Sequence, residues 1–233
     1  MLTVLWLIPL LPFLGFLLNG LFGKRLGKAF VSAVALLATG ASAIASTLAV
    51  VQYHAAYPNG ERYVQVVYNW IRSGNIGADI AFQLDPLTVV MLMVVTWIGF
   101  LIHLYSVGYM SHEEGYGRYF AYLNLFLAEM LVLILGSSYL LMFVGWEGVG
   151  LCSYLLIGFY YKTDYAPAAG KKAFVVNRIG DFGFALGIFG LFFVFKTINL
   201  DALFAAAPSA VGKTMNFLGY DVDIMTVLCL LLF

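Results

Sequence analysis

The sequence predicts an all-α, polytopic membrane protein with a β-hairpin outside the bilayer. Of its 233 residues, 63% are hydrophobic and only 10% are charged, whereas a soluble domain carries about 25% charged residues. The hydrophobic residues gather in runs of about 20, the length that a helix needs to cross a bilayer. Lys and Arg number 12 and Asp and Glu also number 12. No basic excess is available for nucleic acid, so we expect lipid as the surrounding partner.

Six runs are long enough to form complete transmembrane helices. They are Leu2–Phe22, Phe30–Val51, Leu87–Gly108, Tyr119–Gly136, Tyr139–Tyr161 and Ala173–Phe195. The first is expected to be a retained helix, because its positive residues follow it and do not precede it as in a signal peptide. A truncated seventh helix begins near Val222 and reaches Phe233, about 18 Å of a roughly 30 Å core. We therefore expect a fragment of a longer protein.

The connection between Tyr63 and Leu84 is predicted to be a β-hairpin on the outer surface. Hydrophobic and polar residues alternate on both sides of a turn at Ser73–Gly77. Two strands alone are marginally stable in water, so we expect them to rest on helix ends or on a partner. Asp201–Ala207 is expected to form a short surface helix.

The distribution of Lys and Arg predicts an N-terminus outside the cytoplasm. With that orientation the inner loops hold seven of them and the outer loops four, an asymmetry that the positive-inside rule favours. The inner set is Lys24, Arg25, Lys28, Arg118, Lys162, Lys171 and Lys172, and the outer set is Arg62, Arg72, Lys196 and Lys213.

Glu147 is the most informative residue, because it interrupts the fifth hydrophobic run close to the predicted midplane. A carboxyl group there costs about 2.5–3.5 kcal/mol on insertion scales. Such groups usually face a polar interior and serve transport. Three glycines surround it in Gly145–Gly150, and these allow a neighbouring backbone or water to approach the carboxyl. We expect Glu147 to load and release a proton, since burial favours its neutral form and a nearby cation its charged form.

The sixth run supplies candidate partners for Glu147. Arg178 and Asp181 are three residues apart, so they can pair on neighbouring faces of one helix. A stripe of small residues follows, suited to close helix packing: Gly180, Gly183, Gly187 and Gly190. The alternative is that Arg178 and Asp181 form a purely structural ion pair with no role in transport.

Two further buried polar residues are weaker candidates for a proton relay. Glu129 lies in the fourth run, where a hydrogen-bonded structural tether is the alternative role. His103 lies in the third, where a satisfied core histidine is the alternative. Both stay in the candidate set beside Glu147, Asp181 and Arg178.

No pattern predicts a redox or metal site on this chain. Cys152 and Cys229 lie in hydrophobic runs and are too few for an iron–sulfur cluster. No dinucleotide fingerprint, Walker loop or nucleophile elbow is present. The residues themselves therefore indicate ion or proton translocation through a buried acidic relay.

Several motifs resemble one family closely. The run FVGWEGVGLCSYLLIGF at 143–159 is similar to the fifth-helix signature of the L subunits of bacterial respiratory complex I, the proton-pumping NADH:quinone oxidoreductase. KKAFVVNRIGD at 171–181 resembles the next helix, and LDPL at 84–87 and HLYSVGYM at 103–110 fit the third. Mrp-type cation/proton antiporters share the Trp-Glu core but less of its surroundings.

The resemblance implies an antiporter-like fold and a proton-translocating role in the membrane arm. It implies that Glu147 is the carboxylate of an input half-channel, paired with a lysine on the seventh helix and tuned by Arg178 and Asp181. This chain ends before that lysine, and Glu129 has no counterpart in the family pattern. FMN, iron–sulfur clusters and quinone would lie on partner subunits, with none on this chain. The implied partners are other membrane-arm subunits, especially the adjacent antiporter-like one, in a bacterial inner membrane.

On this reading the chain is one membrane domain. Residues 1–118 would hold three helices and the outer hairpin, and 119–233 an incomplete first five-helix antiporter-like repeat. Two other functions stay open: an Mrp-type monovalent cation/proton antiporter subunit, and a structural membrane subunit without transport.

Overall fold

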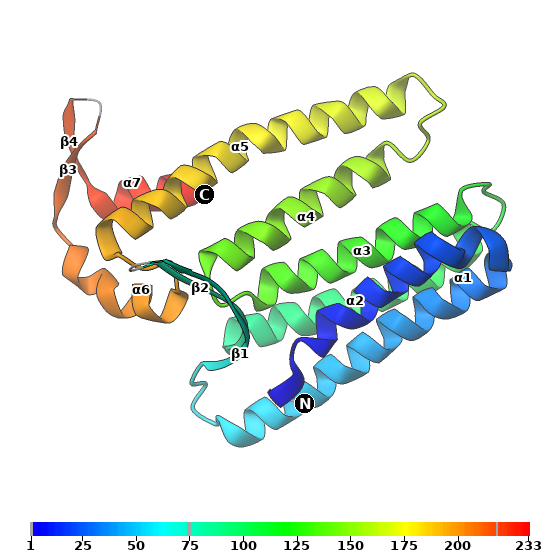
Figure 1. Cartoon of the computed structure of the whole chain (residues 1–233), viewed down its shortest axis with the longest axis horizontal. Helices are drawn as coiled ribbons and strands as arrows, with labels where there is room; N and C mark the ends of the chain where they lie inside the picture. The colour runs from blue at the N-terminus through cyan, green and yellow to red at the C-terminus, as the bar shows by residue number, and fades with distance from the viewer. Residues whose placement is uncertain (1, 74–75, 218) are drawn as a thin grey trace.

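The computed structural model describes residues 2–73, 76–217 and 219–233, and most of them are helical. The long helices lie side by side and alternate in direction (Figure 1). Their bounds are α1 Leu7–Ala56, α2 Pro86–Tyr109, α3 Tyr116–Leu135, α4 Tyr139–Ile157 and α5 Tyr165–Phe195, with short helices α6 Leu200–Ala206 and α7 Ile224–Leu232 and 3₁₀ turns at Leu2–Val4 and Ala207–Ala210. Among the described residues, five helices, α1 to α5, are long and apolar enough to span a membrane. The predicted helical membrane class is thus confirmed.

Helix α1 folds back on itself at Gly27. That residue has φ 83° and ψ 177° inside a 50-residue helical run, a conformation that is open essentially only to glycine. The two limbs run beside each other in opposite directions (Figure 1), and Ser42 Oγ donates to the Ile8 carbonyl at 2.8 Å across them. The two helices predicted at Leu2–Phe22 and Phe30–Val51 are therefore both present, and they are joined by a tight reversal at Gly27. Helical residues continue up to that reversal through Lys24 and Arg25, so the connection is shorter than predicted.

Basic residues also continue the helix at the start of α5, so this helix begins earlier than predicted. It begins at Tyr165 and not at Ala173, because Lys171 and Lys172 continue a helix as readily as they interrupt a hydrophobic window. Helix α4 ends at Ile157 and not at Tyr161. Helix α1 begins at Leu7 and ends at Ala56, five residues later than predicted at each end, and the remaining bounds of α2 to α5 differ from prediction by three residues or fewer.

The outer hairpin is present and rests on helix ends, as predicted. Strands β1 (Tyr63–Ser73) and β2 (Ile76–Leu84) are antiparallel, with Tyr63 opposite Leu84 and two register shifts. Ser137 N–H donates to the Ala81 carbonyl at 3.0 Å, so β2 is tied to the segment between α3 and α4. The predicted turn at Ser73–Gly77 falls partly outside the described residues.

Arg62 anchors this end of the molecule. Its guanidinium lies 3.4 Å from Asp85, the N-cap of α2, and 2.7 Å from Asp201 in α6. It also lies over the Phe204 ring, 5.1 Å from the centroid. Arg72, by contrast, is exposed, and its described partners both lie on the same hairpin: Asp79 at 2.9 Å and the Asn69 Oδ1 at 2.8 Å.

A second hairpin, β3 (Thr214–Phe217) with β4 (Tyr220–Asp223), was missed by the sequence analysis. It leads directly into α7, whose N-cap Asp223 accepts from Thr226 N–H at 2.8 Å. The seventh helix therefore begins at Ile224, two residues later than predicted. The predicted short helix at Asp201–Ala207 is α6, displaced by one residue.

Glycines bring the helices of the second half together. A Cβ built on Gly145 of α4 would lie 2.5 Å from the backbone nitrogen of Leu133 in α3. On α5, Gly187 and Gly190 face Leu232 and Leu228 of α7. The stripe predicted to allow close helix packing does so against α7, and it leaves α4 between α3 and α5 (Figure 1).

Candidate functional site

The candidate site lies where the middle of α4 meets α5. Ser138 begins α4 as its N-cap, with its side chain accepting from Leu141 N–H at 3.3 Å. From that start, Glu147 falls in the middle of the helix and extends toward α5.

Three charged side chains form a central ion group: Glu147, Arg178 and Asp181. Arg178 Nη1 of α5 pairs with Glu147 Oε1 of α4 and lies 3.8 Å from Asp181 Oδ2, one turn farther along its own helix. One guanidinium thus bridges two carboxylates on two helices. A planar guanidinium stays charged at any physiological pH and tolerates an apolar setting better than an ammonium does.

Asp181 is the most deeply buried member, with 8% of its side chain exposed. Trp146 Nε1 of α4 donates to its Oδ1 at 2.7 Å. The residue directly before Glu147 therefore holds the second carboxylate, and the two helices are joined by both a salt bridge and a charge-assisted hydrogen bond. This role of Trp146 was missed, although its position beside Glu147 on the predicted fifth helix was a usable signal.

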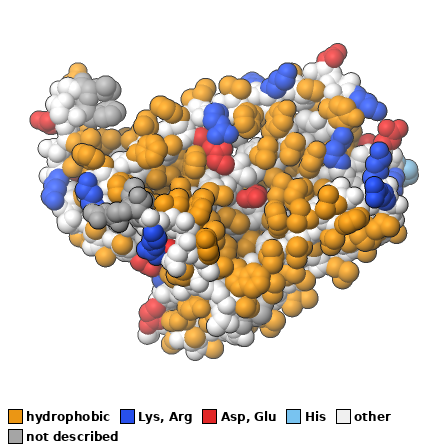
Figure 2. Space-filling model, viewed as in Figure 1, with side chains coloured by type: hydrophobic (Ala, Val, Ile, Leu, Met, Phe, Trp, Pro, Cys, Tyr) orange, Lys and Arg blue, Asp and Glu red, His pale blue; other side chains and the backbone are white. Residues whose placement is uncertain are grey.

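The central ion group opens toward the surface of the isolated chain. Glu147 is 24% exposed and Arg178 51%, and the Arg178 guanidinium lies 5.0 Å from the Phe174 ring centroid. Figure 2 shows blue and red atoms over α4 and α5 within an otherwise hydrophobic surface. Hydrophobic side chains of α5 flank Arg178 on this face, Val175, Ile179 and Phe182 among them.

Glu129 does not join the central ion group. It lies in α3, and its carboxyl occupies the space where Gly148 of α4 lacks a side chain. Glu129 approaches α4 from the side of α3, whereas Arg178 approaches α4 from the side of α5 and meets Glu147 there. No hydrogen bond or ion pair links its carboxyl to another described residue, so the described residues offer no partner for the alternative role as a structural tether.

His103 is also separate from the central ion group. It is buried in α2 beside α3, where its Nδ1 lies 2.7 Å from the Gly99 carbonyl of the preceding turn. Its Nε2 is buried without a partner among the described residues. The ring lies 6.3 Å from Phe120 and lines a hydrophobic hollow between α2 and α3. No described contact connects it with Glu147.

The lysine that the resemblance implies as the partner of Glu147 is not among the residues of α7, whose sequence is IMTVLCLLL. Among the described residues, Arg178 forms the ion pair with Glu147. In the part of the chain that the structure describes, no group of three or more His, Cys, Asp or Glu side chains is placed to hold a metal ion.

Comparisons with known proteins agree with this architecture. Residues 70–120 match the family model for the N-terminus of chain 5 of NADH-ubiquinone oxidoreductase, complex I. Residues 136–232 match the transmembrane model shared by NADH:quinone oxidoreductase and Mrp antiporters. The second match contains the whole central ion group.

Individual relatives extend the similarity over nearly the whole chain. Subunit L of the NADH-quinone oxidoreductase of Rhodobacter capsulatus is 44% identical over 97% of this chain and 32% of its own length. Chain 5 of the NADH-ubiquinone oxidoreductase of Triticum aestivum is 41% identical over 97% and 33%. The chain spans about a third of the length of these curated relatives.

Solved structures show the same fold at low identity. The archaeal membrane-bound sulfane sulfur reductase contains a chain that superposes with a TM-score of 0.77 at 20% identity, covering 99% of this chain and 43% of that one. The Mrp complex from Dietzia sp. DQ12-45-1b gives 0.76 at 21%, covering 97% and 22%. The two family models and the relatives show that the chain belongs to the family of subunit L and chain 5 of NADH:quinone oxidoreductase, and that it matches the N-terminal part of its members.

Proposed function

We propose that this chain takes part in proton translocation in the membrane arm of an NADH:quinone oxidoreductase, with Glu147 as the group that accepts and releases the proton. The observation that carries the proposal is the position of Glu147. It lies in the middle of a helix that is long enough to span a membrane, in contact with one guanidinium that it shares with a second carboxylate. Buried charges in such helices usually mark ion pathways.

The shared guanidinium has a carboxylate partner in either protonation state of Glu147. While Glu147 is ionised, Arg178 neutralises it. When Glu147 takes up a proton its attraction for Arg178 falls, and the 3.8 Å approach to Asp181 gives the guanidinium a second carboxylate to neutralise. A proton can then be held at Glu147 without leaving an unpaired cation in the hydrophobic region, which would cost several kcal/mol.

The membrane arrangement belongs to the same proposal. The two limbs of α1 would cross separately, which with α2 to α5 gives six crossings, and α7 would begin a seventh. Both hairpins and the N-terminus lie at one end of the molecule and the reversal of α1 at the other (Figure 1). Charge asymmetry would place the first end in the periplasm and the whole in a bacterial inner membrane. The division of the chain into residues 1–118 and an incomplete antiporter-like repeat over residues 119–233 is also part of this proposal.

Electron transfer would take place on partner subunits that carry FMN, iron–sulfur clusters and the quinone site. The adjacent antiporter-like subunit is the partner expected to lie closest. The names of the relatives support a reaction between NADH and a quinone in the assembled complex.

The test is Glu147→Gln in the assembled oxidoreductase, which removes the titratable proton and keeps the volume of the side chain. We expect the complex to assemble, with proton pumping and coupled NADH oxidation both reduced, because Gln cannot release a proton. Pumping is measured in inverted vesicles by the quenching of a pH-sensitive dye. Glu61→Gln is the matched control, because Glu61 is exposed on the chain before the outer hairpin. Normal pumping by an intact Glu147→Gln complex would refute the proposal.

The second candidate is an Mrp-type cation/proton antiporter subunit, favoured by the shared transmembrane model and by the Mrp complex among the structural neighbours. It predicts sodium-dependent proton exchange by the assembled complex, and no flavin or iron–sulfur subunits among the proteins that purify with it. A purely structural subunit predicts that Glu147→Gln lowers stability and leaves transport unchanged.

A further inference from the structure

A tryptophan donor contacts the carboxylate that competes with Glu147 for Arg178. The indole Nε1 of Trp146 in α4 donates to Asp181 Oδ1 of α5 at 2.7 Å. The other oxygen of this carboxylate, Oδ2, lies 3.8 Å from Arg178 Nη1, and the same nitrogen pairs with Glu147. Trp146 and Arg178 therefore approach the two oxygens of one carboxylate from two helices.

Asp181 and Glu147 compete for a single guanidinium nitrogen. Arg178 Nη1 lies closer to Glu147 than to Asp181, although Asp181 is the more deeply buried carboxylate, with 8% of its side chain exposed against 24% for Glu147. A buried charge is costly unless it is paired and hydrogen-bonded. Asp181 would therefore attract Arg178 more strongly than it does if no other donor stabilised its charge. Among the described residues, the Trp146 indole is that donor.

Aromatic packing holds the indole in place. The Trp146 ring lies 6.1 Å from the Phe184 ring of α5, and Phe143, one turn earlier on α4, lies 5.7 Å from the same ring. The indole N–H can only donate, and a hydrogen bond to an ionised acceptor is roughly twice as strong as one to a neutral acceptor. The contact therefore favours the charged form of Asp181.

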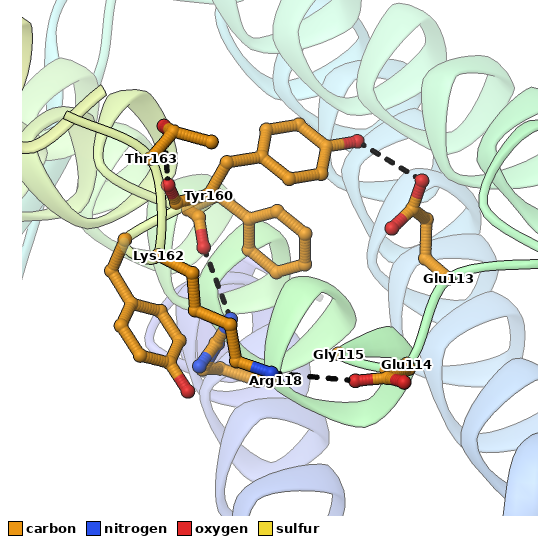
Figure 3. Close-up of a pocket in the computed structure, with 9 residues that line it drawn as sticks. Glu113, Glu114, Gly115, Arg118, Tyr160, Lys162 and Thr163 are labelled. Carbon is orange, nitrogen blue, oxygen red and sulfur yellow. Dashed lines mark hydrogen bonds and ion pairs between the residues drawn. The ribbon is translucent and has the colours of Figure 1, made fainter. Parts of the chain in front are cut away.

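The alignment of α4 with α5 is also fixed at their connection, away from the central ion group. Arg118 Nη2 at the start of α3 donates to the Phe159 carbonyl at 3.0 Å (Figure 3). Its guanidinium lies over the rings of Phe159 and Tyr161, 4.8 and 4.7 Å from their centroids. The Tyr160 hydroxyl donates to the Glu113 carboxylate at 3.3 Å (Figure 3). The two helices are therefore held together by contacts that do not depend on Trp146.

The other charged and titratable side chains around α4 and α5 do not join this competition. The remaining acids and cysteines on α4 and on the elements that pack against α4 or α5 are Glu129 of α3, Cys152 of α4, Cys229 of α7 and Asp79 of β2. Lys171 and Lys172 of α5 are exposed. In the described chain, none of these six makes a hydrogen bond or an ion pair with Glu147 or Asp181. Arg178 and Trp146 are therefore the groups that divide the stabilisation between the two carboxylates.

We propose that Trp146 is a positioning residue for proton transfer, whose indole N–H stabilises ionised Asp181 and so leaves Arg178 with Glu147. The proposal rests on the proton-transfer role of Glu147 and adds the group that sets how firmly Glu147 holds its proton. Without the indole donor, Asp181 draws the guanidinium toward itself. Charged Glu147 then loses part of the cation that favours it, and its proton is released less readily.

The test compares the pH profile of proton pumping by the assembled oxidoreductase with that of Trp146→Phe, which keeps an aromatic ring and removes the donor. We expect the acid limb, where Glu147 must give up its proton, to move to higher pH by about one unit. That shift is a ten-fold change in proton affinity, or about 1.4 kcal/mol, and a hydrogen bond to a charged group is strong enough to supply it. Trp97→Phe is the matched control, because its indole donates to the Thr47 hydroxyl at 3.0 Å, and its acid limb should not move.

A second substitution shows whether the effect passes through Asp181. Asp181→Asn removes the competing charge, so adding Trp146→Phe to it should leave the acid limb where Asp181→Asn alone places it. A shift that persists in the double variant would show that the indole acts elsewhere, and it would overturn the proposal. An acid limb that stays in place, or moves to lower pH, in Trp146→Phe alone would overturn it as well.

Infrared titration of the purified full chain separates this proposal from the proposed function. The C=O band of a protonated carboxyl that disappears in Glu147→Gln reports the protonation of Glu147 without any pumping. Trp146→Phe should raise the midpoint of that band by the same amount of about one pH unit. If the midpoint rises while Glu147→Gln complexes pump normally, the proposed function fails and the effect of Trp146 on Glu147 stands. If pumping requires Glu147 and the midpoint does not move, the inference about Trp146 fails alone.

Discussion

Replacing Gly145 with Ala should push α3 and α4 apart. The new methyl group would lie 2.5 Å from the Leu133 nitrogen and 2.7 Å from its Cα, whereas carbon atoms in contact prefer about 3.5–4.0 Å. The obstacle is backbone, which has no rotamer to change, so the helices must separate by roughly 1 Å. Overpacking of this kind typically costs about 1–3 kcal/mol.

Gly150→Ala is the matched control, because a Cβ on Gly150 meets nothing within 4 Å. Both variants gain the same intrinsic helix propensity, up to about 1 kcal/mol in water, so their difference isolates the collision. We expect Gly145→Ala to unfold with a free energy about 1–3 kcal/mol lower than Gly150→Ala. The assay is reversible unfolding in mixed micelles by stepwise addition of sodium dodecyl sulfate, followed by circular dichroism. Equal midpoints for the two variants would refute the close approach of α3 and α4.

Two further variants test the contacts that join other parts of the molecule. Arg62→Ala removes both ion pairs at the outer end and should cost about 1–2 kcal/mol of unfolding free energy, whereas Arg72→Ala, an exposed pair, should cost less than about 0.5 kcal/mol. Similar losses would argue against an anchor at Arg62. Trp146→Phe keeps an aromatic ring but removes the donor to Asp181 and should cost about 1.5–3 kcal/mol, because the acceptor is charged. Trp97→Phe removes a donor to a neutral hydroxyl, and a loss as large as that of Trp146→Phe would contradict this reasoning.

Hydrophobicity predicted where the chain is helical better than it predicted where each helix ends. The hydrophobic runs that predicted the long helices reflect which segments lipid can solvate. The structure has a long helix at each of these runs. The ends depend on local backbone energies: Gly27 ends one limb of α1 before the next begins, whereas Lys171 and Lys172 continue α5. The second hairpin was missed for a related reason. Its strands are four residues each, and Gly219, which has φ 88°, was a turn signal too small to stand out in the sequence.

One of the two ion contacts in the central ion group, the one between Arg178 and Asp181, could be predicted from sequence spacing alone. Arg178 and Asp181 are one turn apart on any helix, so their proximity follows from the period. The contact between Glu147 and Arg178 joins residues 31 positions apart, and it depends on how α4 and α5 align along their length. No local pattern fixes that alignment. The separation of Glu129 and His103 from the group likewise depends on which face of each helix meets which neighbour.

The reversal at Gly27 couples the two limbs of α1 mechanically. Since no flexible segment separates them, neither limb can slide along the membrane normal, or tilt, without carrying the other. We therefore expect the pair to enter the bilayer as one hairpin, with the basic residues at its bend outside the hydrocarbon region. A side chain in place of the Gly27 hydrogen would strain the bend itself, and the damage would appear as failed insertion of both limbs and not as local fraying.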